Sequence, residues 1–251
     1  MPVKKEAWTP TWSDEFDGPD GSAPDPSKWT VEVSSTSPPN EELQCYTDGA
    51  DNISVRGGEL VITAKREDYR CPDGQLRQYT SGRMNSLGKF AQKYGRFEAR
   101  VRVPSGKGFW PAFWMMGNDI EKVDWPACGE IDVMEQIGRE PTKIFGTIHG
   151  PNYWGEKGPS TVLDLGAPVA AGYHVFAVEW EPERIRFFVD GRLYSARTPA
   201  DIPKGERWVF DHPFFIIVNL AVGGGLPGSP DAQTRFPQEY RVDYVRAFSR
   251  R

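Results

Sequence analysis

The chain has 251 residues, with 35 acidic and 30 basic side chains and a net charge of −5. This surplus of negative charge argues against sequence-independent nucleic-acid binding, which needs a basic surface to displace counterions. The longest apolar run, residues 214–222, contains Asn219 and falls far short of the about 18 residues that a membrane span needs. The 26 Gly and 22 Pro would interrupt long helices. We therefore expect one soluble, helix-poor domain over residues 1–251.

Short segments with period-two alternation follow one another along the chain. Residues 96–103 place Phe97, Ala99 and Val101 on one face and charged side chains on the other, as in a half-buried strand. The pair Asp190-Gly191 is typical of a two-residue hairpin turn. We predict strands at residues 52–56, 59–66, 82–87, 96–103, 109–116, 130–137, 144–149, 173–180, 184–190, 214–222 and 240–249, and loops at 17–50 and 151–172. This pattern favours an all-β sandwich of two antiparallel sheets.

The segment Glu130-Ile131-Asp132-Val133-Met134-Glu135 places three carboxylates within one predicted strand. In a regular strand, Glu130 and Asp132 share one face and Glu135 points to the other. A one-residue bulge near 133–134 would turn Glu135 to the face of the other two. Crowding three negative charges raises the pKa of at least one of them. A retaining glycosidase needs such a pair of carboxyl groups, one as nucleophile and one as acid and base.

Aromatic residues precede this segment. Trp110 and Trp114 alternate with Ala112, so the two indoles share a face, and Trp125 follows shortly after. The flat faces of indoles stack on the apolar faces of sugar rings. Tryptophan near paired carboxylates therefore favours a carbohydrate cleft over an acidic strand edge.

The motif Glu-Ile-Asp-Val-Met-Glu, preceded by Trp-Pro-Ala-Phe-Trp-Met, resembles glycoside hydrolase family 16, and its six-residue form resembles the laminarinase (endo-β-1,3-glucanase) branch. The likeness runs nearly end to end. It includes the segments 12–18, 42–47, 79–83, 94–100, 174–180, 219–224 and 242–246. It implies a β-jelly roll whose concave sheet forms an open substrate cleft, and hydrolysis of internal β-1,3-glucosidic bonds of laminarin-type glucans with retention. Mixed-linkage β-1,3-1,4-glucans are a second substrate class.

The resemblance also implies roles for single residues. It makes Glu130 the nucleophile, Asp132 its assisting acid and Glu135 the acid/base. The implied substrate-binding residues are Asn40, Glu42, Arg83, Trp110, Trp114, Trp125, His149 and Asn219. For His149 and Asn219, a purely structural role stays open at this point.

Members of this family bind a structural calcium ion far from the catalytic residues, and no cofactor is implied for catalysis. The matching positions are Glu15, Gly58 and Asp243, the first two through main-chain oxygens. Oxygen ligands suit a hard cation such as calcium. The resemblance further implies a secreted monomer, with β-1,3-glucan as its partner and neither nucleic acid nor membrane.

Two features leave alternatives open. Residues 1–7 lack the apolar core of a secretory signal, so the protein is intracellular or a leader has been removed. The cysteines Cys45, Cys71 and Cys128 lack metal-binding spacing and allow at most one disulfide, which the sequence does not choose. We expect three thiols.

Three other functions compete with the glucanase. The first is a non-catalytic glucan-binding module, which typically lacks one or both catalytic glutamates. The second is a family 16 hydrolase of agarose, carrageenan or xyloglucan. The third is a catalytic metal site made of Glu130, Asp132, Glu135 and His149, which loss of activity on chelation would support.

Overall fold

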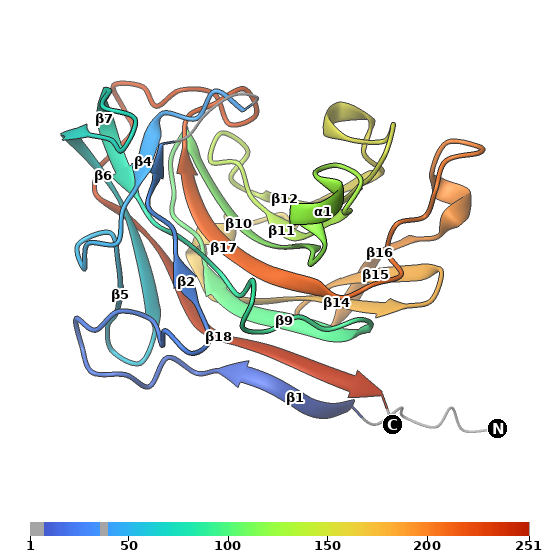
Figure 1. Ribbon diagram of the computed structural model, residues 1–251. Helices are drawn as coiled ribbons and strands as arrows, with labels where there is room; N and C mark the ends of the chain where they lie inside the picture. The colour runs from blue at the N-terminus through green and yellow to red at the C-terminus, as the bar shows by residue number, and fades with distance from the viewer. Residues whose placement is uncertain (1–7, 36–39, 251) are drawn as a thin grey trace.

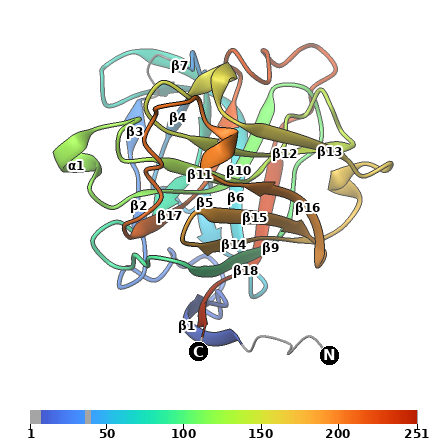
Figure 2. The same ribbon diagram turned by 90° about the vertical axis from the view of Figure 1, so that its right-hand side faces the viewer.

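The computed structural model describes residues 8–35 and 40–250, which form two stacked sheets whose paired strands are antiparallel except for β4 and β7 (Figures 1 and 2). The first sheet has eleven strands, in the order β16 (Arg192–Arg197), β15 (Arg184–Val189), β14 (His174–Glu181), β9 (Gly95–Arg102), β18 (Gln238–Arg250), β6 (Leu60–Arg70), β7 (Leu76–Ser81), β4 (Gln44–Tyr46) and β3 (Ser34–Ser35), with β1 (Trp8–Asp14) beside β18 and β5 (Ile53–Val55) beside β6. The second has seven, in the order β13 (Ser160–Asp164), β12 (Lys143–His149), β11 (Glu130–Glu135), β10 (Phe109–Gly117), β17 (Phe214–Val222), β8 (Arg83–Asn85) and β2 (Thr30–Val31). The predicted β-sandwich is confirmed.

Helical structure is confined to four short segments in the described residues: α1 (Ile120–Val123), η1 (Gly155–Lys157), η2 (Val169–Ala171) and η3 (Pro199–Asp201). None of the described helices has the length and apolar character to cross a membrane. Figure 1 shows α1 and the loop that contains η1, coloured yellow, standing over the concave side of the seven-stranded sheet.

The main core lies between the sheets and uses one face of each strand. On β10, Phe109 and Phe113 are fully buried in this core, whereas Trp110 and Trp114 are half-buried on the opposite, concave face. Alternation along one strand thus separates the residues that stabilise the fold from those available to a ligand. The predicted common face of Trp110 and Trp114 is confirmed.

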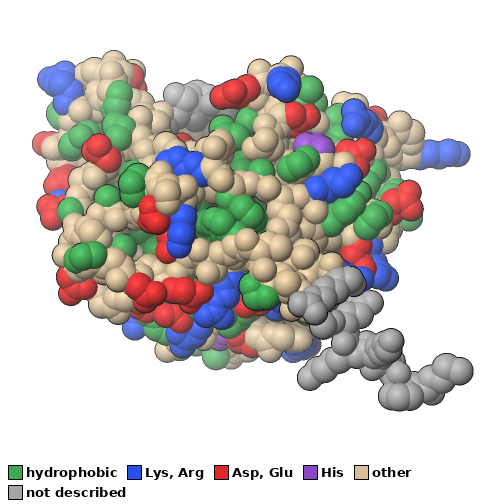
Figure 3. Space-filling view, turned by 60° about the horizontal axis from the view of Figure 1, so that its bottom comes forward, with side chains coloured by type: hydrophobic (Ala, Val, Ile, Leu, Met, Phe, Trp, Pro, Cys, Tyr) green, Lys and Arg blue, Asp and Glu red, His purple; other side chains and the backbone are tan. Residues whose placement is uncertain are grey.

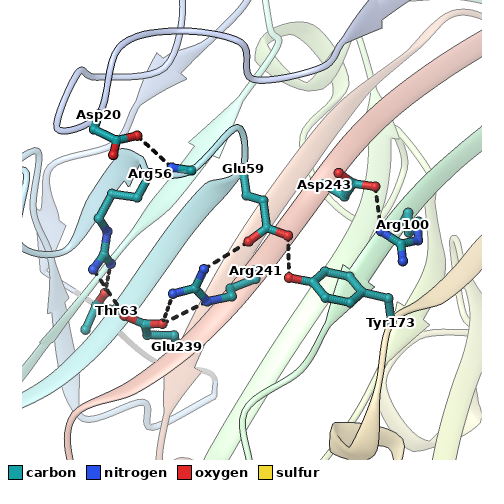
Figure 4. A network of polar contacts seen from close by, with 10 residues as sticks. Asp20, Arg56, Glu59, Thr63, Arg100, Tyr173, Glu239, Arg241 and Asp243 are labelled. Carbon is teal, nitrogen blue, oxygen red and sulfur yellow. Dashed lines mark hydrogen bonds and ion pairs between the residues drawn. The ribbon is translucent and has the colours of Figure 1, made fainter.

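The outer face of the eleven-stranded sheet carries paired charges. Arg241 binds the carboxylates of Glu59 at 2.9 Å and Glu239 at 2.7 Å, and Arg56 reaches Glu239 at 3.1 Å (Figure 4). Tyr173 donates its hydroxyl to Glu59. Figure 3 shows acidic and basic side chains next to one another on this side of the molecule. These pairs keep like charges apart on a long exposed sheet.

Two expectations about loops were wrong. Residues 17–50 contain β2, β3 and β4, and residues 151–172 contain β13. All four strands have five residues or fewer, too short to show an alternation. β1, β7 and β16 were not predicted either. β1 contains Pro10 and an irregular register between Pro10 and Trp12, which breaks its pattern.

The expectation of three thiols was also wrong. Cys45 on β4 and Cys71, just after β6, form a disulfide with their Cα atoms 5.9 Å apart, and Cys128 is a buried thiol. The pairing depends on β6, β7 and β4 lying side by side, which the spacing of the cysteines in the sequence does not reveal. The predicted turn at Asp190-Gly191 is confirmed, because both residues have positive φ, 48° and 76°.

Candidate active site

A bulge in β11 aligns the three carboxylates. Phe113 of β10 pairs with Met134 and the next residue, Trp114, pairs with Asp132, so Val133 has no partner on β10. Val133 and Met134 are both fully buried in the core, which restores the alternation for Glu135. The predicted bulge is confirmed, and with it the placement of Glu130, Asp132 and Glu135 on one face.

The carboxylates line a pocket on the concave face of the seven-stranded sheet. Nine predicted residues come together there with Ala112, which was not predicted: Asn40, Glu42, Arg83, Trp110, Trp114, Glu130, Asp132, Glu135 and Asn219. They come from β8, β10, β11, β17 and the loop before β4. The other two predicted substrate-binding residues, Trp125 and His149, contact the carboxylates from outside this set.

Indole N–H groups hold the two glutamates. Trp110 donates to Oε1 of Glu135 at 2.9 Å, and Trp125 donates to Oε2 of Glu130 at 2.6 Å. Each bond favours the ionised carboxylate and fixes its orientation. These tryptophans therefore position the carboxylates as well as offering apolar surface.

His149 stands opposite Glu130 in the pairing of β12 with β11. Its Nε2 lies 3.0 Å from Oδ2 of Asp132 and 3.9 Å from Oε1 of Glu130. The imidazole is thus part of the carboxylate cluster and not an isolated structural histidine.

Burial dominates the electrostatics of the cluster. It raises the pKa of Glu130 to about 8, with the charge of Asp132 adding to the rise and His149 opposing it. It raises the pKa of Glu135 to about 7, where His149 again opposes and Glu130 adds. Burial and the charge of Glu135 place the pKa of Asp132 well above its usual range. Because the groups titrate together, these values belong to the cluster, which holds protons up to neutral pH.

A hydrogen-bonded chain supports the pocket from behind. Asn219 accepts from the indole of Trp114 at 2.7 Å and donates to the hydroxyl of Tyr46 at 3.1 Å. That hydroxyl in turn donates to Glu42 at 3.3 Å. Tyr46 was not predicted to contact the site, although it lies in the matched segment 42–47 and alternates with Glu42.

A second contact is made with the face of the Trp114 ring. The guanidinium of Arg83 lies 5.0 Å from the centre of that ring, and Glu32 accepts from Arg83 at 3.0 Å. Glu32, which was not predicted, also accepts from Asn85 at 2.7 Å. Trp114 is therefore held on two sides.

One group of side chains in the described residues has the composition of a cation site. Glu130, Asp132 and His149 each offer a ligand atom, and these atoms lie within 4.8 Å of one another. Two carboxylates and an imidazole could hold a divalent ion, but the same atoms also serve acid–base chemistry.

The predicted calcium ligands lie away from the pocket, at the eleven-stranded sheet. The carboxylate of Glu15 accepts from Arg246 at 2.7 and 2.9 Å, and that of Asp243 accepts from Arg100 at 2.7 Å (Figure 4). Gly58 lies in the turn between β5 and β6, with φ of 74°.

Known proteins resemble the whole chain. It is 41% identical over 254 residues to a β-glucanase of Rhodothermus marinus, covering 98% of this chain and 86% of that protein. The solved laminarinase catalytic domain from Thermotoga maritima MSB8 is 42% identical, with a TM-score of 0.91 over 97% of this chain and 99% of that one. The endo-β-1,3-glucanase structure from Pyrococcus furiosus is 42% identical, with a TM-score of 0.93 over 100% and 98%.

The model of glycosyl hydrolases family 16 matches residues 40–246, a range that contains every residue lining the pocket. The sequence, the fold and the three carboxylates on the concave sheet agree, and the chain belongs to family 16 of the glycosyl hydrolases.

Proposed function

We propose that this glycosidase is a retaining endo-β-1,3-glucanase that cleaves internal bonds of laminarin-type glucans. The observation that carries the proposal is the clustering of Glu130, Asp132 and Glu135, with raised pKa values, in one pocket beside Trp110 and Trp114. The likeness to the laminarinase and endo-β-1,3-glucanase structures supports β-1,3-glucan as the substrate.

The reaction uses two displacements. Ionised Glu130 attacks the anomeric carbon while Glu135 gives its proton to the oxygen of the leaving sugar, which breaks the glycosidic bond and forms a glycosyl ester. Glu135, now ionised, takes a proton from water as the water attacks the same carbon and releases Glu130. The hydrogen bond between Glu130 and Asp132 raises the pKa of Glu130 and lowers that of Asp132, so the two carboxyl groups share a proton. The proton must lie on Asp132 when Glu130 attacks.

Two variants test these roles. Glu130→Gln should lower kcat on laminarin by at least about a thousandfold, because the amide that replaces the nucleophile cannot form the ester. Glu135→Ala should be partly rescued by azide, a nucleophile that needs no general base. Products with the inverted anomeric configuration, or full activity of Glu130→Gln, would refute the mechanism.

A substrate panel separates the glucanase from its alternatives. We expect release of reducing ends from laminarin and curdlan, with lichenan testing mixed linkages and agarose testing another polysaccharide class. Calorimetric binding of laminarin without cleavage would instead favour a non-catalytic module. Loss of activity on chelation, at temperatures where the fold is intact, would favour a catalytic metal at Glu130, Asp132 and His149.

We also propose a structural calcium ion at Glu15, Gly58 and Asp243. Because Arg246 occupies the carboxylate of Glu15, its main-chain oxygen is the group left for a cation. Asp243 sits where the pairing of β18 with β9 shifts between Val242 and Tyr244. Its carboxylate accepts from Arg100 here and would exchange this partner for the ion. A chelator should lower Tm, while kcat measured at temperatures well below Tm should not change. In Asp243→Ala, the chelator should no longer lower Tm. A Tm indifferent to both calcium and chelator would refute the site.

Secretion and a monomeric state complete the proposal. The Cys45–Cys71 disulfide supports an oxidising compartment. The monomeric state is the one that the family resemblance implies. Light scattering of the active enzyme tests the monomer, and localisation of the native protein tests secretion.

A further inference from the structure

A stretch of the concave sheet lies on the other side of the carboxylates from the pocket. The residues that line the pocket come from β11, β10, β17 and β8 and from the loop before β4. In the sheet order, β12 and β13 lie on the other side of β11 (Figure 2). Asp132 of β11 pairs with Thr147 of β12, which pairs with Ser160 of β13. Thr147 donates its hydroxyl to Ser160 at 2.9 Å. A row of short hydroxyl side chains therefore leads away from the catalytic cluster.

An apolar pair borders this row on the side of Glu135. Phe145 pairs with Glu135 across β11 and β12, and Val162 pairs with Phe145 across β12 and β13, so all three face the same side. Phe145 is half-buried and Val162 is 50% exposed. This apolar surface faces solvent directly beyond the acid/base.

An exposed tryptophan borders the row on the side of Glu130. Trp154 follows β12 in the loop of η1 and is 48% exposed. Its ring centre lies 5.5 Å from that of Trp125, at an angle of 67° between the planes. Trp125 in turn donates to Glu130, so one residue separates Trp154 from the nucleophile. About half of the Trp154 side chain remains exposed to solvent.

The backbone around Trp154 is fixed. Tyr153 is fully buried and donates its hydroxyl to the carbonyl of Arg207 at 2.9 Å. Its backbone exchanges two hydrogen bonds with Gly150, and Gly158 packs so closely on His149 that a side chain would not fit. A preorganised aromatic side chain loses little freedom when a ligand stacks on it.

We propose that Trp154, with the Phe145–Val162 pair, binds the glucosyl residues on the side of the scissile linkage opposite the pocket. This inference rests on the proposed function. Trp154 offers an indole face to a pyranose ring, and the exposed Ser160, between the two apolar borders, offers a hydroxyl to the sugar. Trp154 is thus a specificity residue for chain length and takes no part in bond breaking.

The test uses Trp154→Ala and Trp154→Phe with laminarihexaose labelled at its reducing end. Trp154→Ala should lower kcat/KM on the hexaose about fivefold, the size expected for loss of one aromatic contact. It should also shift the position of the cut so that more glucosyl units occupy the pocket. Trp154→Phe should recover most of both effects. In a Glu130→Gln background, Trp154→Ala should weaken the binding of laminarihexaose by a similar factor.

The matched control is Leu193→Ala on β16, which removes an apolar side chain of similar exposure, 49%, in the other sheet. It should leave kcat/KM and the cut position as in the parent. Equal kcat/KM and an equal cut position in the parent and Trp154→Ala would overturn the subsite. A parent that does not cleave laminarihexaose at all would instead overturn the proposed function.

Discussion

The Nε2 atom of His149 lies 3.0 Å from Oδ2 of Asp132, the most deeply buried carboxylate of the cluster. The imidazole approaches from β12, whereas the three carboxylates all come from β11. Its effect on Glu130 and Glu135 is to lower both pKa values, against the burial that raises them. The protonation of the pocket therefore depends on a residue that does not line it.

Replacing His149 should move the pH profile of the enzyme. The basic limb of kcat/KM reports the proton on Glu135, whose pKa is raised to about 7. His149→Gln removes the influence that lowers this pKa, so the limb should shift to higher pH. His174→Gln, which alters a histidine paired with Asp190 in the other sheet, is the control and should leave the limb in place. An unchanged limb in His149→Gln would contradict the electrostatic role.

The cluster should make the fold less stable as pH rises. The pKa of Glu130 is raised from 4.5 to about 8, so the folded state binds more protons than the unfolded state between these values. The free energy of unfolding therefore falls as pH increases from about 4.5 to about 8. Glu130→Gln should raise Tm at pH 8 by roughly 2–4 °C, for about 1 kcal/mol, and this gain should shrink toward pH 5. Glu121→Gln, on α1, is the control and should leave Tm unchanged at both pH values. A gain in Tm for Glu130→Gln that does not depend on pH would contradict the link between the protonation of Glu130 and stability.

Removing the hydroxyl of Tyr46 should loosen Trp114 without touching the carboxylates. Tyr46→Phe leaves the buried amide of Asn219 without its acceptor, which costs about 1–3 kcal/mol of stability. We expect a KM on laminarin several-fold higher, with kcat within about twofold. Tyr69→Phe, an exposed tyrosine on β6, should behave as the parent. A fall in kcat alone would place Tyr46 in the chemistry instead.

Reduction of the disulfide should destabilise the enzyme. Cys45–Cys71 closes a loop with a sequence separation of 26, and such a link is worth about 2–4 kcal/mol. Dithiothreitol should lower the Tm of the parent. It should leave the Tm of the double variant Cys45→Ala/Cys71→Ala unchanged. A parent whose Tm ignores reductant would show that the link contributes nothing.

The sequence was sufficient for the strand that carries the chemistry. The alternation of Trp110, Ala112 and Trp114 and the break in alternation before Glu135 both depend on residues adjacent in the chain, and both were confirmed. Local backbone geometry determines such features.

Contacts between distant segments could not be predicted in the same way. Tyr46 reaches Asn219 across 173 positions of the sequence, and Arg83 reaches Glu32 across 51. Their partners are determined by which strands become neighbours. Trp154 shows a related limit, because only its exposure and its packing on Trp125 distinguish it from a core tryptophan.

The unpaired Val133 has a consequence for the distance between the outer carboxyl groups. Without this residue, β11 would be a regular strand in which Glu130, Asp132 and Glu135 still alternate onto one side. The extra residue therefore acts as a spacer, which lengthens the stretch from Glu130 to Glu135 by up to about 3.3 Å. Removing it would bring the two glutamates closer together than the separation of about 5–5.5 Å that a retaining enzyme uses, so the bulge contributes to the working distance of the pair.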